Sequence, residues 1–156
     1  MYHDYKDLLS AFQSHGVKYM VVGGFAVIYH SQPRFTKGLD IFISADPENA
    51  KAIYAALASF GASLKNITPE DFTDRNCFFR FGHEPKAVDI LPSIHGVDFD
   101  TAWERRIETI IDPASGLKAN FISAEDLIAS KLASGRPRDL ADVDEIRKAA
   151  ETRDKA

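Results

Sequence analysis

The sequence predicts an α/β (α+β) domain in which helices pack against a mixed β-sheet. Short apolar runs rich in Val, Ile and Phe, bounded by Gly or Pro, alternate with longer stretches whose apolar residues recur at helical spacing. The 156 residues are 45% hydrophobic, which is enough for one domain with a real core and too little for two. We therefore expect a single domain over 1–156, with a core over about 17–122 and a C-terminal helical pair over about 123–151.

The first half of the chain alternates between helix and strand patterns. Asp46 is a suitable N-cap, Pro47 suits the first helical position that follows it, and Gly61 suits the end of that helix. The elements expected here are a helix over 3–15, a strand over 18–22, a short buried helix over 25–30, a strand over 38–44, a helix over 46–61 and a single turn over 68–72.

The second half begins with two apolar runs joined by a short polar link, which indicates a hairpin. Ser123 is a suitable N-cap near the C-terminus, with Asp126 at the reciprocal capping position. The elements expected here are strands over 76–82 and 86–92, a helix over 98–106, a strand over 107–112, a turn over 113–116, a short edge strand over 117–122, and helices over 123–134 and 136–151.

The composition excludes several classes of protein. A net charge of −4 and a pI of about 5.7 argue against a strongly basic nucleic-acid or membrane-surface binder, although a local basic patch is compatible with them. The single cysteine, Cys77, forms no intrachain disulfide, and we expect a small buried residue there, with a reactive thiol as the alternative. No apolar run is long enough to span a membrane and no signal-peptide pattern begins the chain, so we expect a cytoplasmic protein.

Three features point to chemistry. Gly23 and Gly24 follow a strand and precede a helix, so the backbone there can approach an anion such as a triphosphate, although a tight turn also needs glycine. Asp40 and Asp89 each lie in an otherwise apolar strand. One interpretation is structural: Asp40 is satisfied by backbone N–H groups or by Arg34, and Asp89 is likewise a satisfied structural residue. In the other, the two carboxylates converge on one cation, provided that their strands are neighbours. Such oxygen ligands suit magnesium held together with substrate phosphates.

The ordered set "VGGFAVIYHSQPRFTKGLDIFIS" resembles the signature of the nucleotidyltransferase-fold superfamily, the DNA polymerase beta-like fold. Gly23 and Gly24 match its glycine pair, Asp40 its second carboxylate and Asp89 its third. The segment "SAEDLIASKLASGRPRDLADVDEI" is similar to one that small bacterial members carry, including those grouped with AbiEii-type toxins. The resemblance spans roughly 19–146 and implies a nucleotidyltransferase-like sheet with flanking helices.

The resemblance implies a role for each matching residue. Asp40 and Asp89 would be the catalytic carboxylates and would hold Mg²⁺, with Asp89 the better candidate for the base. The nucleotide-binding residues would be Gly23, Gly24, Lys37, Lys131, Arg136 and Arg138. The activity implied is transfer of a nucleoside monophosphate from an NTP to a hydroxyl on a protein, an RNA or a small molecule.

One position departs from the signature. The first strand carboxylate of the superfamily falls at position 38, where this chain has Gly38. A lost ligand should weaken metal binding while leaving the fold intact. The sequence therefore supports two alternatives: an active enzyme, or a degenerate member that binds a nucleotide or a partner without catalysis. A third possibility is a toxin-like component that works beside a small cognate protein, which is compatible with the first.

Overall fold

The computed structural model describes residues 1–155, which contain six α-helices, one 3₁₀ helix and six strands. The helices are α1 (His3–Ser14), α2 (Gly23–His30), α3 (Pro47–Phe60), η1 (Pro69–Thr73, 3₁₀), α4 (Phe99–Glu104), α5 (Ala124–Ser134) and α6 (Pro137–Lys155). The strands are β1 (Tyr19–Val22), β2 (Gly38–Ile43), β3 (Phe79–Phe81), β4 (Ala87–Leu91), β5 (Ile107–Asp112) and β6 (Leu117–Phe121). The α/β class predicted from the sequence is confirmed.

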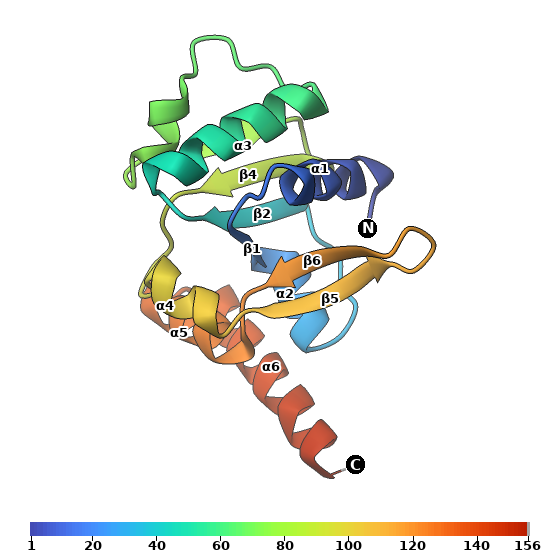
Figure 1. The fold of residues 1–156 in the computed structure, drawn as a ribbon. Helices are drawn as coiled ribbons and strands as arrows, with labels where there is room; N and C mark the ends of the chain where they lie inside the picture. Colours follow the sequence, from blue (N-terminus) through green and yellow to red (C-terminus); the bar gives the residue numbers. More distant parts are fainter. Residues whose placement is uncertain (156) are drawn as a thin grey trace.

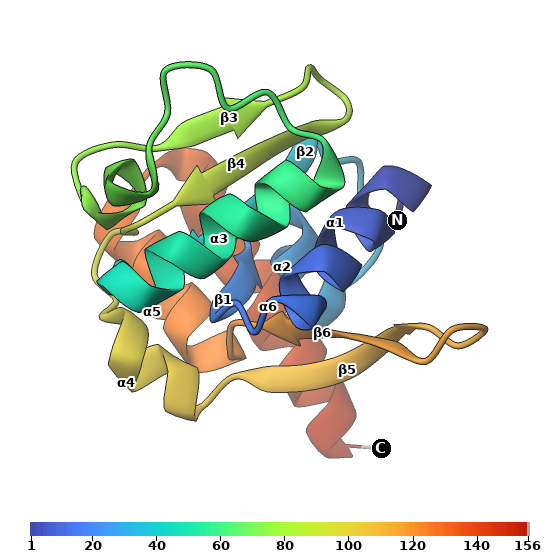
Figure 2. The same cartoon turned by 45° about the horizontal axis from the view of Figure 1, so that its top comes forward.

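The strands form one mixed sheet in the order β3-β4-β2-β1-β6-β5 (Figure 1). β2 runs parallel to β4, and β1 runs parallel to β6, while the other neighbours are antiparallel. Helices α1 and α3 lie side by side on one face, and α2, α5 and α6 lie on the other (Figure 2). The C-terminal part of α6 extends beyond the sheet (Figure 1). The layers bury the central strands on both faces, which explains why they are apolar.

The helix ends use the chemistry that the sequence indicates. The Asp46 carboxylate accepts hydrogen bonds from the first-turn N–H groups of α3, and Gly61 ends that helix in the left-handed conformation. Ser123 accepts from the N–H of Asp126 at the start of α5, as expected for its cap. These local signals fix where the two helices start, and tertiary packing of their buried faces then holds them on the sheet.

Four local predictions are wrong. The segment expected as an edge strand, β6, lies inside the sheet between β1 and β5 because both of its edges are paired. Helix α2 begins at Gly23, two residues earlier than expected. β3 is three residues long, although 76–82 was the expected range. Cys77 is exposed, and its thiol donates to the Asp74 carboxylate; the loop before β3 therefore lies outside the core.

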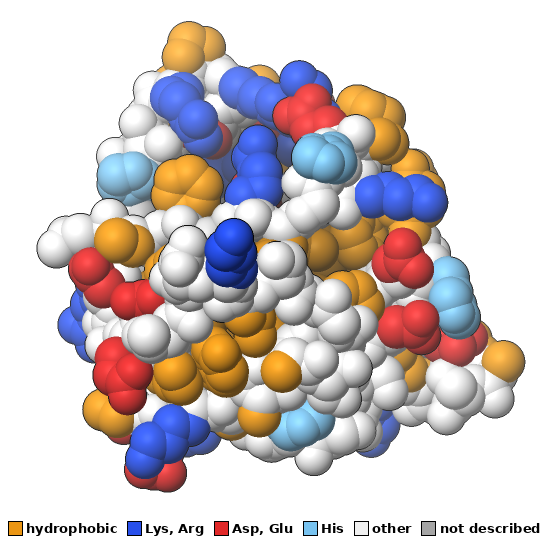
Figure 3. Space-filling model, turned by 90° about the horizontal axis from the view of Figure 1, so that it is seen from above, with side chains coloured by type: hydrophobic (Ala, Val, Ile, Leu, Met, Phe, Trp, Pro, Cys, Tyr) orange, Lys and Arg blue, Asp and Glu red, His pale blue; other side chains and the backbone are white. Residues whose placement is uncertain are grey.

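Within residues 1–155, no helix combines the length and apolar character needed to cross a membrane. Charge is unevenly distributed over the surface. On the face seen in Figure 3, Lys and Arg side chains gather along the upper edge, whereas Asp and Glu side chains are concentrated elsewhere. A net acidic chain therefore does carry a local concentration of cations, which the composition alone left open.

Candidate active site

Asp40 and Asp89 lie directly opposite each other on neighbouring parallel strands. The register pairs Asp40 of β2 with Asp89 of β4. Because side chains alternate along a strand, the two carboxyl groups lie on the same face of the sheet. Val22 of β1 and Arg80 of β3 continue the same row on either side. The sheet thus brings together the two carboxylates that the sequence places 49 positions apart.

The electrostatics of this pair are unfavourable to two negative charges. Burial, followed by the charge of Asp89 and a hydrogen bond with it, raises the pKa of Asp40 from 3.8 to about 6. Arg80 and Lys131 oppose the shift without cancelling it. Two carboxylates so placed are stabilised by an added cation, which would relieve their mutual repulsion. Arg34, one of the partners considered for Asp40 at the sequence level, binds Asp142 instead.

The glycine pair brings helix α2 close to this row. Gly23 has a left-handed φ of 65°, and a Cβ atom there would overlap the carboxylate of Asp40. A Cβ atom on Gly24 would overlap the hydroxyl of Thr36. No side chain caps the N-terminus of helix α2, so the N–H groups of its first turn do not donate to a capping side chain. Glycine is therefore required for close packing at this point, and the helix start also presents N–H donors suited to an anion.

A network of ion pairs around the buried aspartates Asp139 and Asp142 lies across from the sheet, where α5 meets α6. Nζ of Lys131 is 2.9 Å from Asp142 and 3.4 Å from Asp139, while Nε of Arg136 is 2.8 Å from Asp139. Arg34 also binds Asp142. The side chain of Lys131 is only 12% exposed, so it is not a solvated helix lysine.

This network sets the protonation of Asp139. Burial alone would raise its pKa, but hydrogen bonds from Arg136 and Ser134 and the charges of Lys131 and Arg136 outweigh burial and lower it to about 2. Asp139 and Asp142 are thus held by cations of the protein itself.

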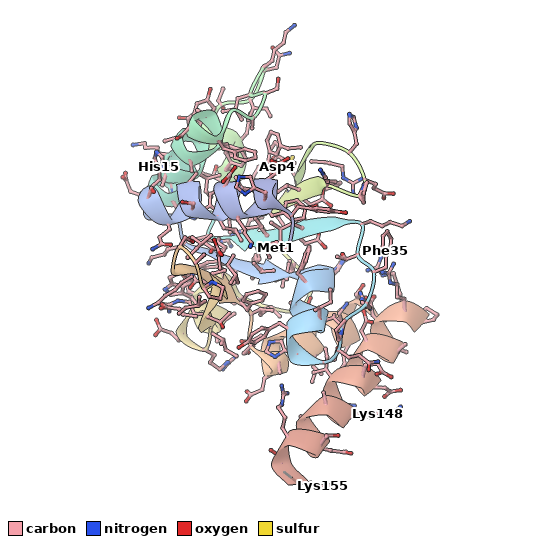
Figure 4. The ribbon with its side chains drawn as sticks, turned by 90° about the vertical axis from the view of Figure 1, so that its right-hand side faces the viewer. Met1, Asp4, His15, Phe35, Lys148 and Lys155 are labelled. Atoms are coloured by element: carbon pink, nitrogen blue, oxygen red, sulfur yellow. The ribbon has the colours of Figure 1, made fainter. Side chains whose placement is uncertain are left out.

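One cavity of about 350 Å³ gathers all the residues singled out from the sequence. Those residues are Gly23, Gly24, Lys37, Asp40, Asp89, Lys131, Arg136 and Arg138. Six Lys and Arg side chains and five carboxyl groups line it in total. Lys37 lies at the exposed rim, 4.0 Å from Glu84. Phe35, in the loop that carries Arg34 and Thr36 to the cavity, lies on the same side of the sheet as α6 (Figure 4).

Two further cavities help to delimit the site. A neighbouring cavity of about 370 Å³ shares Gly23, Asp40 and Lys131 with the first and adds apolar walls from Leu91 and Leu127. The largest cavity, about 820 Å³, lies at the starts of α3 and α4 and contains none of the predicted site residues. The charged cavity and its apolar neighbour therefore form the candidate site, with Asp40 at their boundary.

Position 38 limits the number of metal ligands. A Cβ atom on Gly38 would lie 2.6 Å from the backbone oxygen of Ala87 on the paired strand. Among residues 1–155, no group of three or more His, Cys, Asp and Glu side chains is placed to hold a metal ion. Mg²⁺ is commonly bound by one or two carboxylates together with substrate phosphates and water. The donor set of Asp40 and Asp89 therefore fits one such ion and does not fit two.

Sequence reasoning missed two contributors to the site. Arg80 binds both carboxylate oxygens of Asp89. The second is Tyr5 of α1, whose hydroxyl donates to the backbone oxygen of Ala87 at the start of β4. Burial, followed by the charges of Tyr2, Asp40 and Asp89, raises the pKa of Tyr5 to about 12. Of these, Arg80 had a detectable signal, since a hairpin over 76–82 and 86–92 places it opposite Asp89 in one of its registers.

The mixed sheet, the in-register carboxylates and the glycine-started helix define a protein of the nucleotidyltransferase fold. Residues 4–151 match a family described as nucleotidyltransferase of unknown function (DUF6036), and the chain belongs to this family. The resemblance to the nucleotidyltransferase-fold superfamily is thereby confirmed, while kinship with the AbiEii-type branch stays a prediction. No curated protein matches the chain in sequence.

Proposed function

We propose that this protein transfers a nucleoside monophosphate from an NTP to a hydroxyl acceptor in a Mg²⁺-dependent reaction. The observation that carries the proposal is the single cavity on which the carboxylate pair, the start of α2 and the cations of α5 and α6 all converge. Membership of a nucleotidyltransferase family supports the reaction class.

Binding of the triphosphate would use two walls of the cavity. The first-turn N–H groups at Gly23 and Gly24 would donate to phosphate oxygens from the side of the sheet. Lys131, Arg136 and Arg138 would act from the helical side. Lys131 and Arg136 are already bound to carboxylates, so they are held in place before the ligand arrives, which reduces the entropy lost on binding.

The carboxylate pair would act on the reacting phosphate. Asp40 and Asp89 would hold one Mg²⁺ ion, which when bound neutralises charge on the phosphates and on the leaving pyrophosphate. The acceptor oxygen forms a bond to the α-phosphorus, and the bond between that phosphorus and the oxygen bridging to the β-phosphate breaks. Pyrophosphate leaves with the electron pair of that bond. The proton of the acceptor hydroxyl passes to a carboxylate oxygen of the pair.

The direct test uses the four NTPs, each labelled at the α-phosphate, with a cell extract as the source of acceptors. We expect Mg²⁺-dependent incorporation of label and release of pyrophosphate, both abolished by EDTA. Asp40→Asn and Asp89→Asn should abolish incorporation, whereas Asp144→Asn, which changes an exposed aspartate of α6, should not. Absence of incorporation from every NTP would contradict the proposal.

A second candidate function is a nucleotide-binding module without catalysis. Gly38 favours it, because the packing against Ala87 leaves no room for a third carboxylate on the sheet. Such a protein would bind an NTP without releasing pyrophosphate. A calorimetric titration with each NTP, followed by assay of the same sample for pyrophosphate, separates the two functions.

The acceptor class and the partner stay predictions. A protein, an RNA or a small molecule can each supply the hydroxyl, and the identity of the labelled product in the assay above decides among them. A toxin-like role predicts a cognate small protein that copurifies with this chain from its native host. The cytoplasmic location is predicted as well, and fractionation of that host tests it.

A further inference from the structure

Arg80 is a cation on the sheet side of the cavity to which the proposed function assigns no role. It lies on β3, directly opposite Asp89 of β4. Its Nε is 2.8 Å from one carboxylate oxygen of Asp89, and its Nη2 is 3.0 Å from the other. A two-point contact of this kind fixes the plane of the guanidinium group as well as its position. Arg80 is therefore held beside the carboxylate row.

The guanidinium group keeps donors free for a ligand. Nη1 of Arg80 has no hydrogen-bond partner among residues 1–155, and the side chain is 53% exposed while Asp89 is 16% exposed. Arg80 also lines the cavity that contains Gly23 and Lys131. Asp89 thus anchors one edge of the guanidinium, and another edge is available to an anion in the cavity.

A bound triphosphate would bring negative charge that the site must compensate. A triphosphate carries several negative charges, and sites of phosphoryl transfer neutralise them with metal ions and arginines. The donor set fits one Mg²⁺ ion, because Ala87 closes position 38 to a side chain. One divalent ion offsets only part of the charge on the ligand and on the two aspartates, and Lys131 and Arg136 are already paired with Asp139 and Asp142.

We propose that Arg80 contacts the triphosphate directly and serves as a further cation of the site, which has carboxylate ligands for one Mg²⁺ ion only. The inference rests on the proposed function, since it assigns Arg80 to the substrate of that same site. It makes Arg80 a substrate-binding residue that also holds Asp89 in position. Arginine suits both tasks, because its donors are arranged as a planar fork.

The test is a calorimetric titration with inorganic triphosphate, which contains no base and so needs no knowledge of the preferred NTP. Wild type, Arg80→Gln and Arg80→Lys are compared in Mg²⁺ and again in EDTA. Arg147→Gln on the exposed face of α6 makes the same change of charge outside the cavity and is the matched control. Thermal melts of all four proteins check that each is folded.

We expect Arg80→Gln to weaken triphosphate binding by about ten-fold or more in both buffers, because a charge-assisted contact is lost. Arg80→Lys, which keeps the charge and loses the fork, should fall between it and wild type, and Arg147→Gln should match wild type. Equal or tighter binding by Arg80→Gln in saturating Mg²⁺ would overturn the inference and leave the proposed function standing, since Arg80 would then only hold Asp89 or compete with the ion. If wild type itself binds no triphosphate, both proposals fail.

Discussion

Asp40 and Asp89 line the sheet side of the cavity, and Asp139 and Asp142 line its helical side. The two pairs differ in the charges around them and in the direction of their pKa shifts. The helical pair is surrounded by Lys131, Arg136 and Arg34, and the pKa of Asp139 is lowered to about 2. On the sheet, Arg80 pairs with Asp89 only. Asp40 forms no ion pair within residues 1–155, and its pKa is raised to about 6 by burial and by the neighbouring Asp89.

The difference separates structural carboxylates from those available to a ligand. A carboxylate pair already supplied with cations from its own chain gains little from another cation. A pair such as Asp40 and Asp89, in which only Asp89 has an ion-pair partner, gains more from an added cation. The ionised Asp40 lowers stability while no cation is bound. The charge balance around each pair, more than the presence of acidic residues, therefore points to the sheet side as the place for Mg²⁺.

The largest effect should follow from disturbing the helical pair. Lys131→Ala leaves Asp139 and Asp142 buried with one arginine partner each, so we expect the free energy of unfolding to fall by about 3 kcal/mol. Urea denaturation measures the loss. Lys148→Ala removes a lysine that is 73% exposed on α6 and should change stability by less than about 0.5 kcal/mol. Similar results for the two variants would show that the network is not structural.

Removing a charge from the sheet pair should raise the free energy of unfolding, whereas removing Lys131 from the helical pair lowers it. The folded-state pKa of Asp40, about 6, lies above the ordinary 3.8, so its ionisation destabilises the folded state progressively from about pH 4 to pH 6 and fully above that. Asp40→Asn should therefore raise the free energy of unfolding at pH 8 by on the order of 2 kcal/mol and change it little below pH 4. Asp144→Asn is the exposed control. A variant less stable than wild type at pH 8 would refute the contrast.

The contribution of Asp139 to stability should change with pH in the opposite sense to that of Asp40. Its folded-state pKa of about 2 lies below the ordinary 3.8, so its ionised form stabilises the protein above about pH 4 and that contribution disappears as the pH falls toward 2. Asp139→Asn should destabilise the protein by about 2 kcal/mol at pH 7 and have little effect near pH 2. Urea melts across this range measure the difference, and an effect that does not depend on pH would indicate lost packing instead.

The sequence predicts the elements of this fold well, because their signals are local. The cap at Asp46, the left-handed Gly61 and the periodicity of α1 each act within a few residues. The interior place of β6 and the exposure of Cys77 depend on pairing across the sheet and on the path of a loop, which no local pattern encodes.

The same distinction holds for the candidate site. The glycine pair and the two strand carboxylates could be named from the sequence, because each interrupts a pattern. The hydroxyl of Tyr5 beneath β4 could not, since it joins residues far apart in the chain. The ion pairs of Lys131 could not either, since they depend on how α5 packs against α6. Position 38 lies between these cases: the missing carboxylate is visible in the sequence, but the reason that none fits is visible only where β2 meets Ala87.

The smallest expected effect concerns Gly38, and it bears on why the sheet pair lacks a third ligand. A Cβ atom there must displace the backbone of Ala87, whose oxygen also accepts the Tyr5 hydroxyl. Gly38→Ala should therefore lower the free energy of unfolding by about 1–2 kcal/mol, as overpacking does.

Gly38→Ala is also the matched control for Gly38→Asp, because the two share the Cβ atom and differ in the carboxylate. Without metal, we expect Gly38→Asp to be at least as unstable as Gly38→Ala, since it adds a third negative charge to the row. Thermal melts in EDTA and in Mg²⁺ then isolate the carboxylate. If Mg²⁺ stabilises Gly38→Asp and leaves Gly38→Ala unchanged, the strand can yield and a further ligand can be installed. If neither responds, the contact with Ala87 fixes the site at two carboxylates, and any catalysis it performs must proceed with them and the surrounding cations.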